Sequence, residues 1–150
     1  MELIEALRQT RHNLLKTVEA YTIDEMNVVP EGFNNSLLWN LGHVWVTQKM
    51  LHYGLSGLPL NIEDELVNQF RKGSKAIVLK EETLSRIKSD FIKSVDDLER
   101  DLNENIFKEF RPYRTSYNVE LESLDDALWF NNMHEAMHLG YMLAMRKSVK

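Results

Sequence analysis

The sequence predicts an all-α protein: a four-helix bundle with a long connection between its second and third helices. Four segments carry apolar residues at helical spacing, and proline, glycine or N-capping residues separate them. The chain has 150 residues, a usual length for one domain with one core. We therefore expect residues 1–150 to fold as a single helical domain.

The first helix is predicted over residues 2–21. Leu3, Leu7, Leu14 and Val18 repeat at spacings of four and seven, which is typical of an amphipathic helix. Residues 29–32 then contain a proline and a glycine, which favour a turn. We expect a loop from there to residue 35.

The second helix is predicted over residues 37–53, directly after Ser36, a good N-cap residue. Its apolar side chains cover nearly every direction around the helix axis, and a helix exposed on one side would not tolerate this pattern. The sequence therefore indicates either the most buried helix of the bundle or a contact between two subunits.

The third helix follows a long connection. Residues 54–80 contain three glycines and a proline, and only residues 62–70 could form two helical turns. The third helix is predicted over residues 81–105, where apolar residues form a narrow seam in a charged segment. The seam consists of Leu84, Ile87, Phe91, Val95, Leu98 and Leu102.

The fourth helix is predicted over residues 124–146. Residues 106–122 lack a helical period, and we expect an irregular loop or a short hairpin there. Ser123 and Asp126 then approximate a capping box. Arg146 and Lys147 suit the negative end of the helix dipole.

Composition and charge exclude several classes of function. The formal net charge of −5 is spread along the chain, so nothing favours binding to nucleic acid. The chain has no cysteine, which excludes disulfides, thiolate ligands and a sulfur nucleophile of its own. It shows neither a signal-peptide pattern nor a membrane-spanning run, and we expect a cytoplasmic protein without a membrane partner.

Three histidines form the candidate site. His134 and His138 lie one turn apart in the fourth helix, so both imidazoles can reach the same point. Their stripe faces inward and includes Ala127, Phe130, Asn131, Tyr141 and Met145. His43 is expected to face inward from the middle of the second helix. A single inward histidine is typical of core packing, but two at chelating spacing with a third nearby favour one divalent metal ion.

Three imidazoles without a thiolate fit nickel, zinc, iron or manganese and leave coordination positions open. Thr47 and Asn131, each one turn from a histidine, are candidates to orient an imidazole or a bound water, or are ordinary polar residues of a helix surface. His12 and His52 lie toward polar helix edges, where we expect surface side chains.

Residues 134–138, His-Glu-Ala-Met-His, match the H-E-x-x-H pattern of zinc metalloproteases. Those enzymes need a third ligand, usually downstream, yet residues 139–150 contain no histidine, aspartate or glutamate. The sequence therefore argues against a protease. Glu135 is a candidate general base if it borders the metal, although a solvent-exposed position at the helix edge is favoured.

Residues 40–43, Asn-Leu-Gly-His, together with residues 134–140, His-Glu-Ala-Met-His-Leu-Gly, resemble the bacterial DinB/YfiT-like superfamily. The resemblance covers nearly the whole chain. It implies a bundle, commonly a homodimer, that binds nickel, zinc or a similar ion through His43, His134 and His138. The family name records induction by DNA damage, and it implies a stress-response protein rather than one that binds DNA. Some similar proteins are thiol-dependent enzymes.

The leading hypothesis is a metal-dependent enzyme that transfers a small external thiol to electrophiles, as in detoxification. Arg111 and Arg114 would then bind carboxylates of the thiol, or would form a solvated basic loop. One alternative is a small-molecule hydrolase with a metal-bound water and Glu135 as base. Another is a non-catalytic, metal-binding stress-response dimer.

Overall fold

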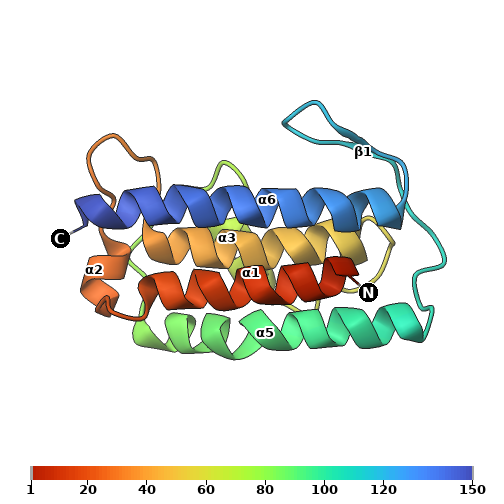
Figure 1. Ribbon diagram of the computed structural model, residues 1–150, viewed down its shortest axis with the longest axis horizontal. Coiled ribbons are helices and arrows are strands. Elements are labelled where there is room, and N and C mark those ends of the chain that lie inside the picture. The colour runs from red at the N-terminus through yellow and green to blue at the C-terminus, as the bar shows by residue number, and fades with distance from the viewer. Residues whose placement is uncertain (1, 150) are drawn as a thin grey trace.

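The computed structural model describes residues 2–149 and shows the predicted all-α bundle. Its four long helices are α1 (Glu2–Val18), α3 (Leu37–Lys49), α5 (Glu81–Asn103) and α6 (Leu124–Met145). α1 and α6 run in one direction, and α3 and α5 run in the other (Figure 1). α1 packs against α6 and α5, and α3 packs against the same two helices. Because α3 and α5 are parallel, the chain between them must return along the bundle, as predicted.

The segment after the first helix differs from the prediction. α1 ends at Val18 rather than at residue 21, and a short helix, α2 (Ile23–Asn27), follows. The Thr22 hydroxyl accepts a hydrogen bond from the Glu25 backbone N–H, and the Glu25 carboxylate accepts one from the Thr22 N–H. This capping box is visible in the sequence as Thr-x-x-Glu, and it starts a helix that the apolar pattern alone does not reveal.

α3 is the most buried helix, because every residue in it except Thr47 is buried within the single chain. Ser36 caps it as predicted, accepting the Trp39 N–H at 3.1 Å. The helix continues into a π-helical turn, η1 (Met50–Gly54). With its side chains covered by this chain, α3 has no free face for another subunit, and the alternative of a subunit contact through this helix is wrong.

The connection from α3 to α5 contains α4 (Asp64–Phe70), as the sequence predicts for residues 62–70. The Phe70 ring packs directly on Gly42 of α3 and occupies the space that a side chain at position 42 would need. Glycine is therefore required for the close approach of this connection to α3.

A small hairpin precedes α6. β1 (Tyr113–Arg114) pairs antiparallel with β2 (Glu120–Leu121), as expected for residues 106–122. The hairpin stands at the end of the bundle where α6 begins (Figure 1). Ser123 caps α6 by accepting the Asp126 N–H at 3.2 Å. After α6 the chain forms a short 3-10 turn, η2 (Arg146–Ser148).

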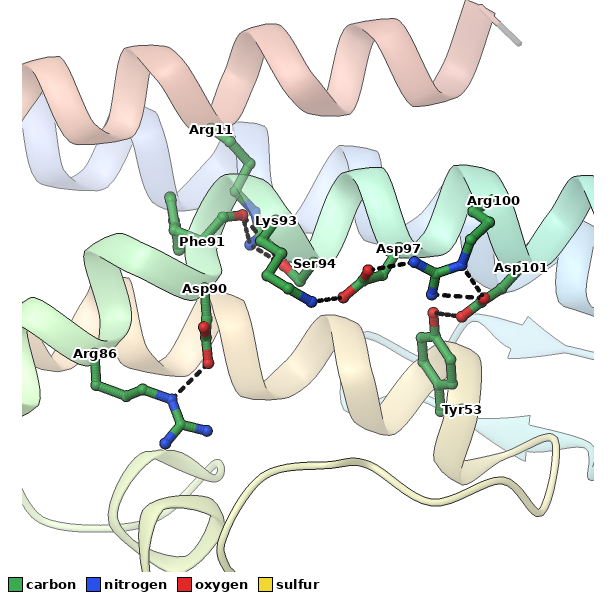
Figure 2. Close-up of polar contacts among 10 residues, drawn as sticks. All are labelled: Arg11, Tyr53, Arg86, Asp90, Phe91, Lys93, Ser94, Asp97, Arg100 and Asp101. Atoms are coloured by element: carbon green, nitrogen blue, oxygen red, sulfur yellow. Dashed lines mark hydrogen bonds and ion pairs between the residues drawn. The ribbon is translucent and has the colours of Figure 1, made fainter.

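α5 buries its predicted apolar seam, except that Leu102 is only partly buried. It carries a row of polar contacts beside the seam (Figure 2). The Tyr53 hydroxyl donates to Asp101 at 2.6 Å, and Arg100 donates to both Asp97 and Asp101. The bond from Tyr53 ties η1 to the end of α5, whereas the Arg100 contacts lie within α5. Across residues 2–149, no helix combines the length and apolar character needed to cross a bilayer.

Candidate metal centre

The bundle brings the three predicted histidines together. α3 supplies His43, and α6 supplies His134 and His138 one turn apart. The ring centroid of His43 lies 5.3 Å from that of His134 and 5.0 Å from that of His138. The ring centroids of His134 and His138 lie 4.5 Å apart. One ring nitrogen from each residue lies within 4.8 Å of the others. The three side chains can therefore reach one metal ion.

Hydrogen bonds fix the tautomers of two of these imidazoles. The Nδ1–H of His43 donates to the Phe70 carbonyl at 2.7 Å, and that of His138 donates to Asn40 Oδ1 at 2.8 Å. The Asn40 amide is itself oriented, because its Nδ2 donates to the Ser36 carbonyl. Each imidazole therefore carries its free lone pair on Nε2, which is the tautomer needed for binding a metal through that atom.

The third imidazole, His134, has no satisfactory hydrogen-bonding arrangement without a cation. His134 Nε2 lies 3.2 Å from His138 Nε2, and His134 Nδ1 is buried without a hydrogen-bond partner among residues 2–149. If the His134 proton is on Nδ1, two lone pairs face each other; if it is on Nε2, a buried acceptor is left unpaired. A divalent ion among the Nε2 atoms would remove the repulsion between lone pairs.

Burial keeps the imidazoles neutral. It lowers the pKa of His134 from 6.5 to about 2, with a further contribution from the adjacent His138 and His43. Burial likewise lowers the pKa of His138 to about 3. It also lowers the pKa of His43, against the opposing effect of the hydrogen bond to Phe70. All three are neutral at pH 7, the form that binds metals.

A cavity of about 350 Å³ opens beside the cluster. His43 and His134 line it together with Thr47, whose hydroxyl lies 3.4 Å from His43 Nε2. Other walls come from η1, the segment after it, the hairpin and Phe130. A ligand in this cavity would lie against two of the three imidazoles.

The two candidate arginines differ in position. Arg111 lines the cavity, as expected for a residue that binds a ligand there. Arg114 does not line it; its guanidinium donates to Asn118 and forms an ion pair with Glu120 across the hairpin. Arg114 therefore holds the hairpin together rather than facing the site.

The favoured position of Glu135 in solvent is wrong. Its side chain is fully buried, and its two oxygens accept hydrogen bonds from Arg11 of α1, each at 2.6 Å. Asn131 donates to the same carboxylate at 2.9 Å rather than to an imidazole. Arg11 also reaches the Phe91 carbonyl and Ser94 of α5 (Figure 2). This ion pair joins three helices, and Glu135 does not line the cavity.

Two further expectations about side-chain exposure are corrected. His52 was expected at the surface but is fully buried, because the π-helical turn rotates it inward beside Gln48. Tyr141 was expected inside but is 37% exposed, with its ring edge against Phe33. His12 is exposed, as predicted.

The groups that hold the imidazoles were not predicted from the sequence. Asn40 lies three residues before His43, and this spacing on one helix face was a usable signal. The carbonyl of Phe70 left no signal, because every residue has a backbone carbonyl. Arg11 also left none, since a buried arginine is recognised only once its partner is placed beside it.

Comparison with known proteins identifies the fold family. The family model described as the DinB superfamily matches residues 6–142. A search of curated protein sequences found no match. The family match spans both the α3 and α6 segments that carry the three histidines.

Proposed function

This chain belongs to the DinB superfamily, and from that premise we propose that it is a metal-dependent enzyme with one divalent ion held by His43, His134 and His138. The convergence of three neutral imidazoles carries the proposal. Their nitrogen ligands suit nickel, zinc, manganese or iron. Asn40 and Phe70 would keep two of the rings in the metal-binding tautomer.

The adjacent cavity favours an enzyme over a protein in which the ion has only a structural role. A structural site is closed by its protein ligands, whereas a catalytic site keeps a position open. Here the cavity reaches His43 and His134, so a small molecule can approach the cluster. A bound divalent ion would lower the pKa of a coordinated thiol or water and so supply a nucleophile at neutral pH.

The reaction we propose is transfer of a small external thiol to an electrophile. The sulfur bonds to an electrophilic carbon, a leaving group departs with its electron pair, and the thiol proton passes to solvent. The thiol must be external because the chain contains no cysteine. Hydrolysis with Glu135 as the base is not favoured, since Arg11 and Asn131 occupy that carboxylate away from the cavity.

Metal analysis tests the site. Untagged wild-type protein in chelator-free buffer should contain close to one divalent ion per chain, and His134→Ala should contain little. His12→Ala removes an exposed histidine outside the cluster and should retain the metal. If neither wild type nor variant takes up nickel, zinc, manganese or iron, the three histidines are core residues and the proposal is wrong.

Thiol transfer is tested separately. Metal-loaded protein with a small thiol and 1-chloro-2,4-dinitrobenzene should release chloride faster than the thiol alone, and His134→Ala should abolish the difference. If metal-loaded protein does not accelerate this reaction with several thiols and binds no thiol by calorimetry, thiol transfer is wrong. The metal site would not be affected by that result.

We also infer that the enzyme is a homodimer that pairs through α6. Between Asp126 and Arg146, every exposed residue of α6 is apolar, aromatic or glycine: Trp129, Met133, Ala136, Met137, Gly140, Tyr141, Leu143 and Ala144. This set is called the outer face of α6. A helix that is apolar in all directions is normally buried all round, so the outer face requires a cover.

A second copy of the chain fits the outer face. In an antiparallel pairing of two α6 helices about a two-fold axis near residue 136, Trp129 lies opposite Ala144 of the other copy. Met133 likewise lies opposite Gly140 of the other copy. Large side chains thus meet small ones, which allows the helices to approach closely. The same alignment places Asp126 near Lys147 of the other copy, so opposite charges meet at both ends. Two-fold pairing satisfies all these contacts twice.

A further inference from the structure

We propose that the cavity beside the histidine cluster binds an amphipathic organic anion, with an apolar body inside and a carboxylate at its mouth. The inference rests on the proposed function in one respect: the anion is taken to be the electrophilic substrate. Lys72 and Arg111 are assigned as the residues that select its charge.

Much of the cavity lining is apolar. It includes Met50, Leu51, Leu55, Leu58, Leu60 and Phe130, and all of these except Met50 are buried or partly buried. These residues come from η1, the chain after it and α6, so no single flexible segment forms the wall. The volume, about 350 Å³, lies near the lower end of the range for small-molecule sites. An apolar body of modest size would gain hydrophobic stabilisation there.

The mouth of the cavity is positively charged. Lys72 and Arg111 line it, both are exposed, and the lining contains no aspartate or glutamate. Within residues 2–149, no ion pair joins either side chain to a carboxylate. The whole chain carries a net charge of −5, so this local excess of two cations runs against the overall balance. It would attract an anion and disfavour a cation.

The hairpin adds polar groups next to these charges. Tyr113, Ser116 and Tyr117 line the same cavity and are exposed, so their hydroxyls are available to a ligand. The backbone of Arg111 is held beside the cavity because its N–H donates to the Leu55 carbonyl at 2.7 Å. The guanidinium of an arginine at this position can form a bidentate contact with a carboxylate.

This division between apolar walls and a cationic mouth distinguishes the two substrates of the proposed reaction. Small biological thiols with several polar groups match the leucine-rich walls poorly. An acceptor with an aliphatic or aromatic body and one carboxylate matches both parts. Arg111 is therefore assigned to the acceptor, and not to the thiol.

Calorimetry with three probes of equal chain length tests the charge selection. Octanoate, octanamide and octylammonium share an apolar chain and differ in the charge of the head group. Octanoate should bind wild-type protein roughly 5- to 10-fold more tightly than octanamide, and octylammonium should bind most weakly.

Matched variants identify the residues responsible. Arg111→Met and Lys72→Met should each weaken octanoate roughly 3- to 10-fold and leave octanamide unchanged. Lys75→Met removes a neighbouring cation that does not line the cavity, and this variant should bind octanoate as wild type does. Equal affinities for octanoate and octanamide, or a loss of the same size in Lys75→Met, would overturn the inference.

A repeat after removal of metal with a chelator separates this inference from the proposed function. If the preference for octanoate and its loss in Arg111→Met persist without metal, the two cations select the anion whether or not the protein is a metalloenzyme. If the preference disappears with the metal while Arg111→Met has no effect, the ion alone binds the carboxylate. The inference then fails, and the metal site stands.

Discussion

At the scale of single residues, Asn40 is the clearest test of how the imidazoles are held. Its Oδ1 accepts the Nδ1–H of His138, and Asn40→Ala would leave that ring free to rotate or change tautomer. We expect metal affinity to fall roughly 10- to 100-fold, the usual effect of losing such a supporting contact. Competition with a chromogenic chelator measures the change.

Asn132→Ala provides the control for that substitution. Asn132 lies on α6 near the histidines but donates only to the Leu128 carbonyl of its own helix. Metal affinity should therefore match that of wild type. If Asn40→Ala also kept wild-type affinity while remaining folded, the hydrogen bond to His138 would not contribute to metal binding.

His52 predicts a specific dependence of stability on pH. Burial lowers its pKa in the folded protein from 6.5 to about 3. The unfolded chain therefore takes up a proton below pH 6.5 that the folded chain does not. Above pH 6.5, His52 has no effect on the pH dependence of stability. As the pH drops from 6.5 toward 3, His52 lowers the free energy of unfolding. At pH 5 the loss from this residue is about 2 kcal/mol.

Urea denaturation of wild type and His52→Gln at pH 7.5 and pH 5 measures this loss. His52→Gln removes one titrating group, so its stability should decline less between the two pH values by about 2 kcal/mol. Equal declines in the two proteins would show that His52 is not held neutral in the fold. Working with metal-free protein in both cases keeps metal release out of the comparison.

The candidate site could be predicted only in part from the sequence. The three histidines could be grouped because their spacing and inward faces are readable from helical period. The burial of Glu135 and His52 could not. Glu135 depends on an arginine more than a hundred positions away, and His52 depends on a π-helical turn that changes the period after Lys49. Local patterns contain neither fact.

At the scale of helices, two glycines offer a matched comparison. Gly42 in α3 is covered by the Phe70 ring, whereas Gly140 in α6 has open space around it within the chain. Gly42→Ala should destabilise the protein by about 1–3 kcal/mol through overpacking. It should also weaken metal binding, because displacing Phe70 removes the acceptor of the His43 Nδ1–H.

Gly140→Ala should instead stabilise an isolated chain by up to about 1 kcal/mol, because alanine favours a helix. Thermal unfolding of both variants at low protein concentration gives the comparison. A Gly42→Ala protein with unchanged stability and metal affinity would contradict the close approach of α4 to α3. The two substitutions are chemically identical, so helix propensity alone cannot explain opposite effects.

Most helices could be predicted from periodicity and capping. α3, α5 and α6 begin where N-cap residues or the end of the preceding loop indicate, and α4 lies within its predicted range. α2 was missed because five residues are too few to show a helical period, although its capping residues were present. Helix ends moved by one to four residues, since the last turn depends on tertiary contacts.

At the scale of the whole molecule, the outer face of α6 predicts the oligomeric state. Wild-type protein should sediment as a dimer at micromolar concentration. Ala136→Glu places a charge at the centre of the proposed pairing, opposite Met137 of the other copy, and should yield a folded monomer. Val78→Glu alters another exposed apolar residue, outside α6, and should leave the dimer intact.

A wild-type protein that is monomeric across the accessible concentration range would rule out this pairing. The sequence pointed to a dimer through the second helix for a sound reason, since a helix apolar in all directions needs cover. In the structure, α3 is buried by the chain itself, whereas α6 is left exposed on one side, so α6 is the helix that needs cover. Which of the two helices is exposed depends on how the helices pack, and the apolar pattern of each helix does not contain that information.

The contact between Gly42 and Phe70 has a consequence for how related sequences can vary. His43 is held by the backbone carbonyl of residue 70, which any amino acid supplies, so the histidine itself places no demand on that side chain. The demand comes from the neighbouring glycine, whose missing side chain makes room for the ring. Positions 42 and 70 should therefore covary in size among homologues, with alanine at 42 accompanied by a smaller residue at 70, while His43 stays constant.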